Sequence, residues 1–108
     1  MTAIDPNIPK LLNIKQKDQE RRLAETIGEI RILEQKLSDL AREVESVDSQ
    51  PDGIGRISVA NGYLNYVQHR REALIRQIHE LNARVEEIQS ELRKSLHSQS
   101  MLQNHEGA

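Results

Sequence analysis

The sequence predicts an all-α fold, an antiparallel two-helix coiled-coil hairpin, on three observations. Charged residues make up 30% of the 108 residues, and the chain has no Phe or Trp and only two Tyr. Large side chains are therefore too scarce to fill a thick globular core at close-packed density. Leu, Ile and Val nevertheless recur at heptad spacing in two long segments, which one stretch rich in Pro and Gly separates. A chain of this length forms one domain, so the hairpin is expected to span residues 1–108.

The first helix is expected from about residue 8 to residue 47. Pro6 and Pro9 keep the first residues extended, and beyond them only Gly28 disfavours a helix. The apolar side chains mostly step by three and four residues, as the a and d positions of a heptad repeat do. These positions are Leu23, Ile30, Leu33, Leu37, Leu40, Val44 and Val47.

The stretch "DSQPDGIG" is the one clear break in the helical pattern, and it predicts a turn over residues 48–57. A second turn signal follows, because Asn61-Gly62 stands between short apolar runs and such a pair favours a two-residue β-hairpin. Leu64 is already in phase with the next helical repeat, however, and a lone two-stranded ribbon is only marginally stable. Of the two structures, a β-hairpin and a helix, these observations favour a helix that begins at Ser58, a good N-cap residue.

The second helix is expected over about residues 58–100, followed by a frayed tail over residues 101–108. Arg71 occupies one seam position, where it either extends outward beside Glu34 or meets an acidic partner surface. Two apolar stripes of equal length joined by a short turn should fold back on each other. The apolar seam positions are Leu64, Val67, Leu74, Ile78, Leu81, Val85, Ile88 and Leu92.

Folding back places a polar stretch of the first helix opposite apolar positions of the second. In "KQKDQERR" (residues 15–22) the a and d positions are Gln16 and Gln19, and they face Val85 and Ile88. Two interpretations stay open. The stretch is either a loosely packed, partly solvated part of the seam or a surface left for another protein.

The composition argues against several classes of function. The chain has no cysteine, no glycine-rich phosphate loop and no histidine pair at metal-binding spacing, so we expect no enzyme, cofactor or metal site. The formal net charge of −2 argues against nucleic acid, and a two-helix rod has no pocket for a small-molecule substrate. No apolar run suits a membrane span or a signal peptide, which predicts a soluble, cytoplasmic protein. Its charged face is mostly solvated, with Asp18 and Arg22 spaced for an ion pair.

Two stretches resemble one family. The first, "ERRLAETIGEIRILEQKLSDLAREVE" (residues 20–45), is similar to the first helix of FliJ-type flagellar export proteins, where an R-L-A/G-E-like run leads into an E-x-x-L-x-x-L heptad block. The second, "GYLNYVQHRREALIRQIHEL" (residues 62–81), is similar to the start of their second helix, where an aromatic and basic cluster follows a glycine-containing turn. The resemblance covers about residues 11–95, and the order and spacing of the motifs carry it.

The resemblance implies a function. FliJ-type proteins are non-enzymatic antiparallel coiled coils of the type III export apparatus, in which they act as stalk and adaptor. The partners implied are the hexameric export ATPase, the export gate protein and export chaperones. Attachment to the cytoplasmic face of the inner membrane would be made only through these proteins. The part of the first helix that contributes to gate binding in the family matches Leu11–Arg22.

The expected partner-binding residues form two groups. The first group surrounds the polar seam positions: Lys15, Gln16, Gln19 and Arg22. The second group combines aromatic and basic side chains: Tyr63, Tyr66, Arg70 and Arg71. Tyr and Arg are the residue types most enriched in interface hot spots, and tyrosines at i and i+3 lie on one flank of a helix.

A second resemblance is to prefoldin β-type chaperone subunits, which have a similar length and two coiled-coil helices joined by a β-hairpin. The stretch "RISVANGYLNYV" (residues 56–67) would be that hairpin. A generic coiled-coil scaffold is the third possibility. Strand content around Asn61-Gly62 separates the chaperone from the other two.

Overall fold

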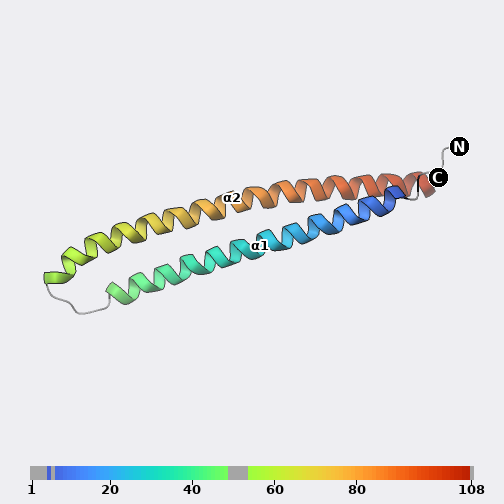
Figure 1. Cartoon of the computed structure of the whole chain (residues 1–108). Helices are drawn as coiled ribbons and strands as arrows, with labels where there is room; N and C mark the ends of the chain where they lie inside the picture. Colours follow the sequence, from blue (N-terminus) through green and yellow to red (C-terminus); the bar gives the residue numbers. More distant parts are fainter. Residues whose placement is uncertain (1–4, 6, 49–53, 108) are drawn as a thin grey trace. The chain divides into compact units, whose positions relative to one another are not determined.

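The computed structural model describes residue 5 and residues 7–48 and 54–107. These residues form two α-helices, α1 (Asn7–Asp48) and α2 (Ile54–Gly107), which pack against each other (Figure 1). No strand occurs in the described part of the chain. The predicted all-α helical hairpin is therefore confirmed.

Asp5 fixes the start of α1. Its carboxylate accepts a hydrogen bond from the backbone N–H of Asn7 at 2.9 Å, and its carbonyl oxygen accepts one from the N–H of Ile8 at 3.0 Å. These bonds satisfy two of the N–H groups that the first turn of a helix leaves without helical partners. Helix α1 consequently begins at Asn7, one residue before the predicted start.

The second helix is longer at both ends than the sequence predicted. It begins at Ile54 instead of Ser58 and ends at Gly107 instead of about residue 100. Ser58 therefore lies inside the helix, and its predicted role as N-cap is wrong. Gly55 is an unfavourable helix residue, but its cost of about 1 kcal/mol is too small to end a helix, and no proline follows. The predicted frayed tail is likewise helical as far as Gly107.

Helix α2 also runs through Asn61 and Gly62, the pair that could have formed a β-turn. The β-hairpin interpretation is wrong, because a lone two-stranded ribbon is only marginally stable, whereas a helix here continues into the apolar repeat of residues 64–92. Residues 49–53 of the predicted turn lie outside the described residues. The break between the two helices is thus bounded by Asp48 and Ile54.

The helices contribute to two compact units. Unit 1 comprises Met1–Gly28 and Ala83–Ala108, and unit 2 comprises Glu29–Asn82. In each unit, a segment of α1 packs against a segment of α2. Over the described residues, neither helix combines the length and the apolarity that crossing a bilayer requires.

The core of unit 2 is the predicted heptad seam. Its buried apolar side chains are Ile30, Leu40, Leu74 and Leu81. All four are predicted a or d positions, so the apolar repeat does determine which helix faces pack. Leu64 was also expected on the seam, but it is 51% exposed. A heptad repeat advances 3.5 residues per turn and an α-helix 3.6, so seam positions drift toward one flank along the helix.

Among the described residues of unit 1, one apolar side chain is buried, Ile88, and two polar ones are, Gln19 and Ser95. The sequence predicted Gln19 at a polar seam position, whereas Ser95 was not recognised. Ser95 stands seven residues after Ile88, so the seam of α2 continues through it, while the neighbouring Leu96 is exposed. Unit 1 is therefore sealed by a more polar seam than unit 2.

Gly62→Ala should leave stability unchanged or raise the free energy of unfolding by up to about 1 kcal/mol, because Ala is the better helix former. A Cβ atom at Gly62 would meet nothing within 4 Å. Thermal unfolding followed by circular dichroism measures the effect. Gly28→Ala in α1 is the matched control, since a Cβ atom there also meets nothing within 4 Å. A clear loss of stability at Gly62 alone would instead indicate a turn with φ > 0.

Candidate protein-interaction site

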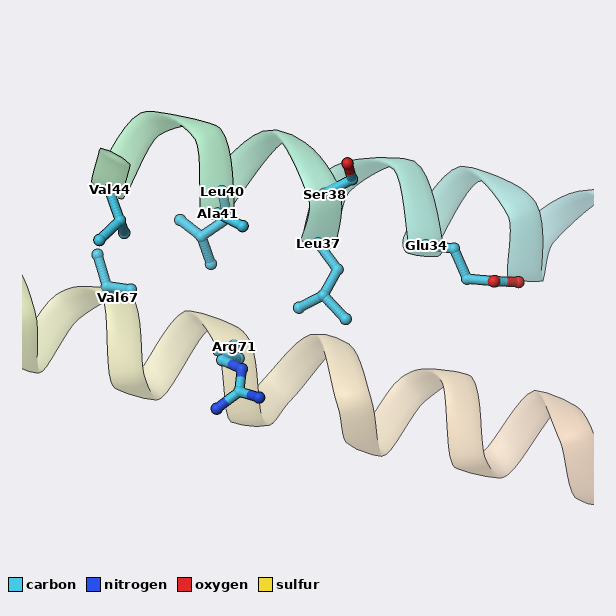
Figure 2. A pocket seen from close by; sticks show the side chains of 8 residues that line it. All are labelled: Glu34, Leu37, Ser38, Leu40, Ala41, Val44, Val67 and Arg71. Carbon is cyan, nitrogen blue, oxygen red and sulfur yellow. The ribbon is translucent and has the colours of Figure 1, made fainter. Parts of the chain in front are cut away.

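Unit 2 has an open groove of ≈ 610 Å³ between α1 and α2 (Figure 2). Apolar side chains form most of its lining: Leu37, Leu40, Ala41, Val44 and Val67. Figure 2 shows Val44 of α1 and Val67 of α2 pointing toward each other across it. Two residues of opposite charge, Glu34 of α1 and Arg71 of α2, complete the lining together with Ser38.

The charged residues of the groove do not pair with each other. Among the ion pairs of the described residues, none joins Arg71 to Glu34, and both side chains are exposed. Figure 2 shows the Glu34 carboxylate directed away from Arg71. Arg71 therefore extends out of the seam, as one of its two predicted interpretations requires, but it leaves its charge beside an apolar surface.

The two tyrosines lie together on the flank of α2 that faces away from this groove. The ring centroids of Tyr63 and Tyr66 are 6.4 Å apart, with an interplanar angle of 33°. Tyr66 is 57% exposed, and Tyr63 is half-buried. Arg70 follows Tyr63 by seven residues and shares its flank, whereas Arg71 points toward the groove. The structure thus separates Arg71 from the other three residues of its predicted group.

The flank that carries the tyrosines also has a second, smaller groove of ≈ 330 Å³. Its lining residues are Glu29, Ile32, Leu33, Gln77, Glu80 and Leu81. Gln77 stands seven residues after Arg70, so the groove continues the surface on which Tyr66 lies. We call this surface of unit 2 the tyrosine flank: Glu29, Ile32, Tyr63, Tyr66, Arg70, Gln77 and Glu80.

Four members of the tyrosine flank were not predicted from the sequence, and Ile32 is the one among them with a large apolar side chain. It is 59% exposed, although it is a large apolar residue in the middle of α1. A signal was available, because Ile32 is apolar at a position outside the a and d sites of the repeat. Leu11 and Ile14 in unit 1 are exposed in the same way.

The first predicted group of partner-binding residues is dispersed around α1 in unit 1. Lys15 is exposed, and Gln16 is half-buried and donates from Nε2 to Oε1 of Glu20 at 3.0 Å. Arg22 is exposed and forms an ion pair across the seam with Glu91 at 3.8 Å. Gln19, in contrast, is 2% exposed. A partner could therefore touch the first three side chains but could reach Gln19 only if the helices separated.

The side-chain amide of Gln19 is buried without a hydrogen bond. Neither its oxygen nor its nitrogen has a partner among the described residues. The Arg22–Glu91 ion pair indicates the register of the two helices here. In an antiparallel pair, the residue three positions before Arg22 lies level with the residue three to four positions after Glu91. Gln19 therefore lies level with Ser95, the other buried polar residue of the unit. A buried polar group without a partner costs about 1–3 kcal/mol.

An ion-pair cluster covers the outer side of α1 in unit 1. Arg21 contacts Asp18 at 2.6 Å and Glu25 at 3.4 Å. The predicted Asp18–Arg22 pair is wrong, because Asp18 pairs at i+3 with Arg21 while Arg22 reaches the other helix. The hydrogen bond to Asp18, followed by the charges of Glu25 and Asp18, raises the pKa of Arg21. Arginine is charged at neutral pH in any case, so the two carboxylates only favour this charged form further.

No family model matches the chain, and no match is found among curated proteins or among solved structures. Within residues 7–48 and 54–107, no group of three or more His, Cys, Asp or Glu side chains could hold a metal ion. The fold and its surfaces define a two-helix coiled-coil hairpin. Its candidate site is the tyrosine flank of unit 2.

Proposed function

We propose that this protein is a non-enzymatic coiled-coil stalk and adaptor of the flagellar (type III) protein export apparatus. Its partners are the export ATPase, the export gate protein and export chaperones. The observation that carries the proposal is the tyrosine flank, which presents exposed aromatic and aliphatic side chains on a helical scaffold. The export apparatus is chosen because both helices resemble FliJ-type proteins over about residues 11–95.

The tyrosine flank has the composition of a protein-binding surface. Tyr66 and Ile32 are both more than half exposed, and large exposed apolar side chains on a helix are candidate contact points for a partner. Along α2 the tyrosine pair comes first, Arg70 follows Tyr66 by four residues, and Gln77 and Glu80 of the smaller groove follow Arg70 by seven and ten residues. Aromatic residues and Arg are enriched at protein interfaces, so the composition of this flank suits one.

The paired tyrosines suit an anchor for a partner. Two rings in contact hold each other in place, so little conformational entropy remains to be lost when a partner binds. Both rings come from one helix, which positions them more firmly than a loop would. A partner surface with an apolar pocket and an acidic residue for Arg70 fits this end of the flank.

Unit 1 supplies the second proposed contact. Leu11 and Ile14 are more than 60% exposed at the start of α1, close in sequence to the exposed Lys15. These residues fall in the segment that matches the gate-binding part of the family, Leu11–Arg22. We therefore assign gate binding to the outer side of α1 and exclude the buried Gln19 from the contact.

Replacing both tyrosines, Tyr63→Ala with Tyr66→Ala, should weaken binding to the export ATPase or the gate protein at least tenfold, about 1.4 kcal/mol. The loss is expected because Tyr is among the residues that dominate binding free energy at interfaces. Surface plasmon resonance with the purified full-length chain measures it, after a pull-down has shown which of the two components binds.

Leu64→Ala is the matched control for this experiment. Leu64 is 51% exposed and adjacent to Tyr63 in sequence, but it lies on the other flank of α2. Its replacement should leave the partner affinity unchanged. Circular dichroism must show the same helicity in all variants. If partner binding survives in the double tyrosine variant, or the hairpin melts, the tyrosines are packing residues and the site is wrong.

A further inference from the structure

We propose that the groove of unit 2 binds a second copy of this chain, in a two-fold dimer that places Glu34 of each copy against Arg71 of the other. The surface is the groove face, which we define by Glu34, Leu37 and Val44 of α1 and Val67, Arg71 and Ile75 of α2. This inference is independent of the export function, because the tyrosine flank lies on the opposite side of unit 2.

The exposed surface of the chain leaves room for a dimer interface. The chain exposes 8539 Å² at a mass of 12.4 kDa. A compact monomer of that mass exposes about 6,100 Å², so about 2,400 Å² is in excess. A standard interface removes about 800 Å² from each partner. This excess is spread over both units, and it is larger than the area that a second copy would cover.

The apolar lining of the groove extends along α2. Ile75 follows Arg71 by one helical turn, shares its flank, and is 42% exposed. Ile75 therefore prolongs the apolar strip that begins with Val67 and the side chains of α1 opposite it. A single two-helix pair has no third element to cover such a strip, whereas two pairs can cover each other as a four-helix bundle.

The charges of the groove face select a second copy as the occupant. A two-fold axis at right angles to the helices, crossing the groove midway between Glu34 and Arg71, exchanges the levels of these two residues. This axis sets α1 of each copy against α1 of the other, so Glu34 lies level with Arg71 of the other copy on the adjacent helix. The long Arg71 side chain spans between the two helices, and the same contact forms twice. Within one chain this pair is not formed, so both charges are free to meet a partner copy. The net charge of −2 adds little repulsion between copies.

The first test is the mass of the full-length chain in solution. Sedimentation equilibrium over a concentration series should give twice the mass of one chain, with dissociation on dilution. Glu34→Arg and Arg71→Glu should each weaken dimerisation at least about tenfold, because each reversal sets two pairs of like charges against each other. A wild-type chain that is monomeric at every concentration overturns the proposal.

The decisive experiment mixes the two single variants. One carries arginine at both positions and the other carries glutamate at both, so in the proposed dimer every contact between them is attractive. The mixture should form a heterodimer of about wild-type affinity, although each variant alone is mainly monomeric. If Glu34 and Arg71 act only within one chain, the combined variant E34R/R71E regains stability but the mixture of single variants does not dimerise. That result overturns the proposal.

Two variants that replace an exposed isoleucine with glutamate test whether the groove face is the dimer interface. Ile75→Glu should abolish dimerisation, because it buries a charge in the interface, and should leave helicity unchanged because the side chain is exposed in the monomer. Ile32→Glu is the matched control, since Ile32 is exposed to a greater degree on the opposite flank. Equal loss of dimer in both variants, or a loss only at Ile32, overturns the assignment to the groove face.

Discussion

Leu74→Ala should lower the free energy of unfolding by about 3 kcal/mol, within the 2–5 kcal/mol that buried Leu→Ala changes cost. Leu74 is 1% exposed, the lowest value among the apolar core residues of the described chain. Its removal loses the transfer free energy of three carbon atoms and leaves a cavity that two packed helices cannot easily close. Urea unfolding at one fixed protein concentration measures the loss, since association would otherwise contribute to it.

Leu11→Ala provides the control for Leu74→Ala. The chemical change is the same, but Leu11 is 63% exposed, so stability should change by less than about 0.5 kcal/mol. Similar losses for the two variants would mean that the seam of unit 2 is not the core. The same comparison tests whether the heptad positions, and not the general helix propensity, hold the hairpin together.

The hairpin was predictable because its apolar repeat is regular. In unit 2 the buried apolar side chains among the described residues are all at a and d positions. Packing these two helix faces together removes the apolar stripe of each helix from water, which no other pair of faces would do. The ends of α2 were not predictable in the same way. Gly55 and the tail after residue 100 are weak helix signals, and the cost of each is small against the packing of a long helix.

The candidate site was predicted only in part, because a shift of one residue along a helix moves a side chain from one flank of the helix to the other. Arg70 and Arg71 are neighbours in sequence, yet about 100° of rotation places one beside the tyrosines and the other in the groove. The partner of an ion pair was equally hard to predict from the sequence. Arg22 was expected to pair along α1, but the register of the two helices brings Glu91 within 3.8 Å. The register is a property of both helices together, which the repeat of either alone leaves open.

Gln19→Leu should raise the free energy of unfolding by about 1–3 kcal/mol, the desolvation cost of a buried polar group without a partner. Gln19 is 2% exposed, and neither atom of its amide has a hydrogen bond in the described structure. Leu has a similar volume and suits a buried seam position, so it removes the unsatisfied amide without leaving a cavity. Thermal unfolding should show a rise in Tm of several degrees, since about 1 kcal/mol corresponds to roughly 4–8 °C in a small domain.

Gln16→Leu is the matched control for this change, because Gln16 lies one turn away on α1 but is half-buried and bonded to Glu20 at 3.0 Å. It should change stability by less than about 0.5 kcal/mol. A loss of stability in Gln19→Leu would mean that the amide has a partner in solution, for which the hydroxyl of Ser95 is the nearest candidate by register. Ser95→Ala would then lower stability in the wild type but not in the Gln19→Leu background, which a double-mutant cycle detects. A stabilised variant without such coupling would instead show that unit 1 carries an unsatisfied amide in its seam. Buried polar residues of this kind can specify the register of two helices at a cost in stability.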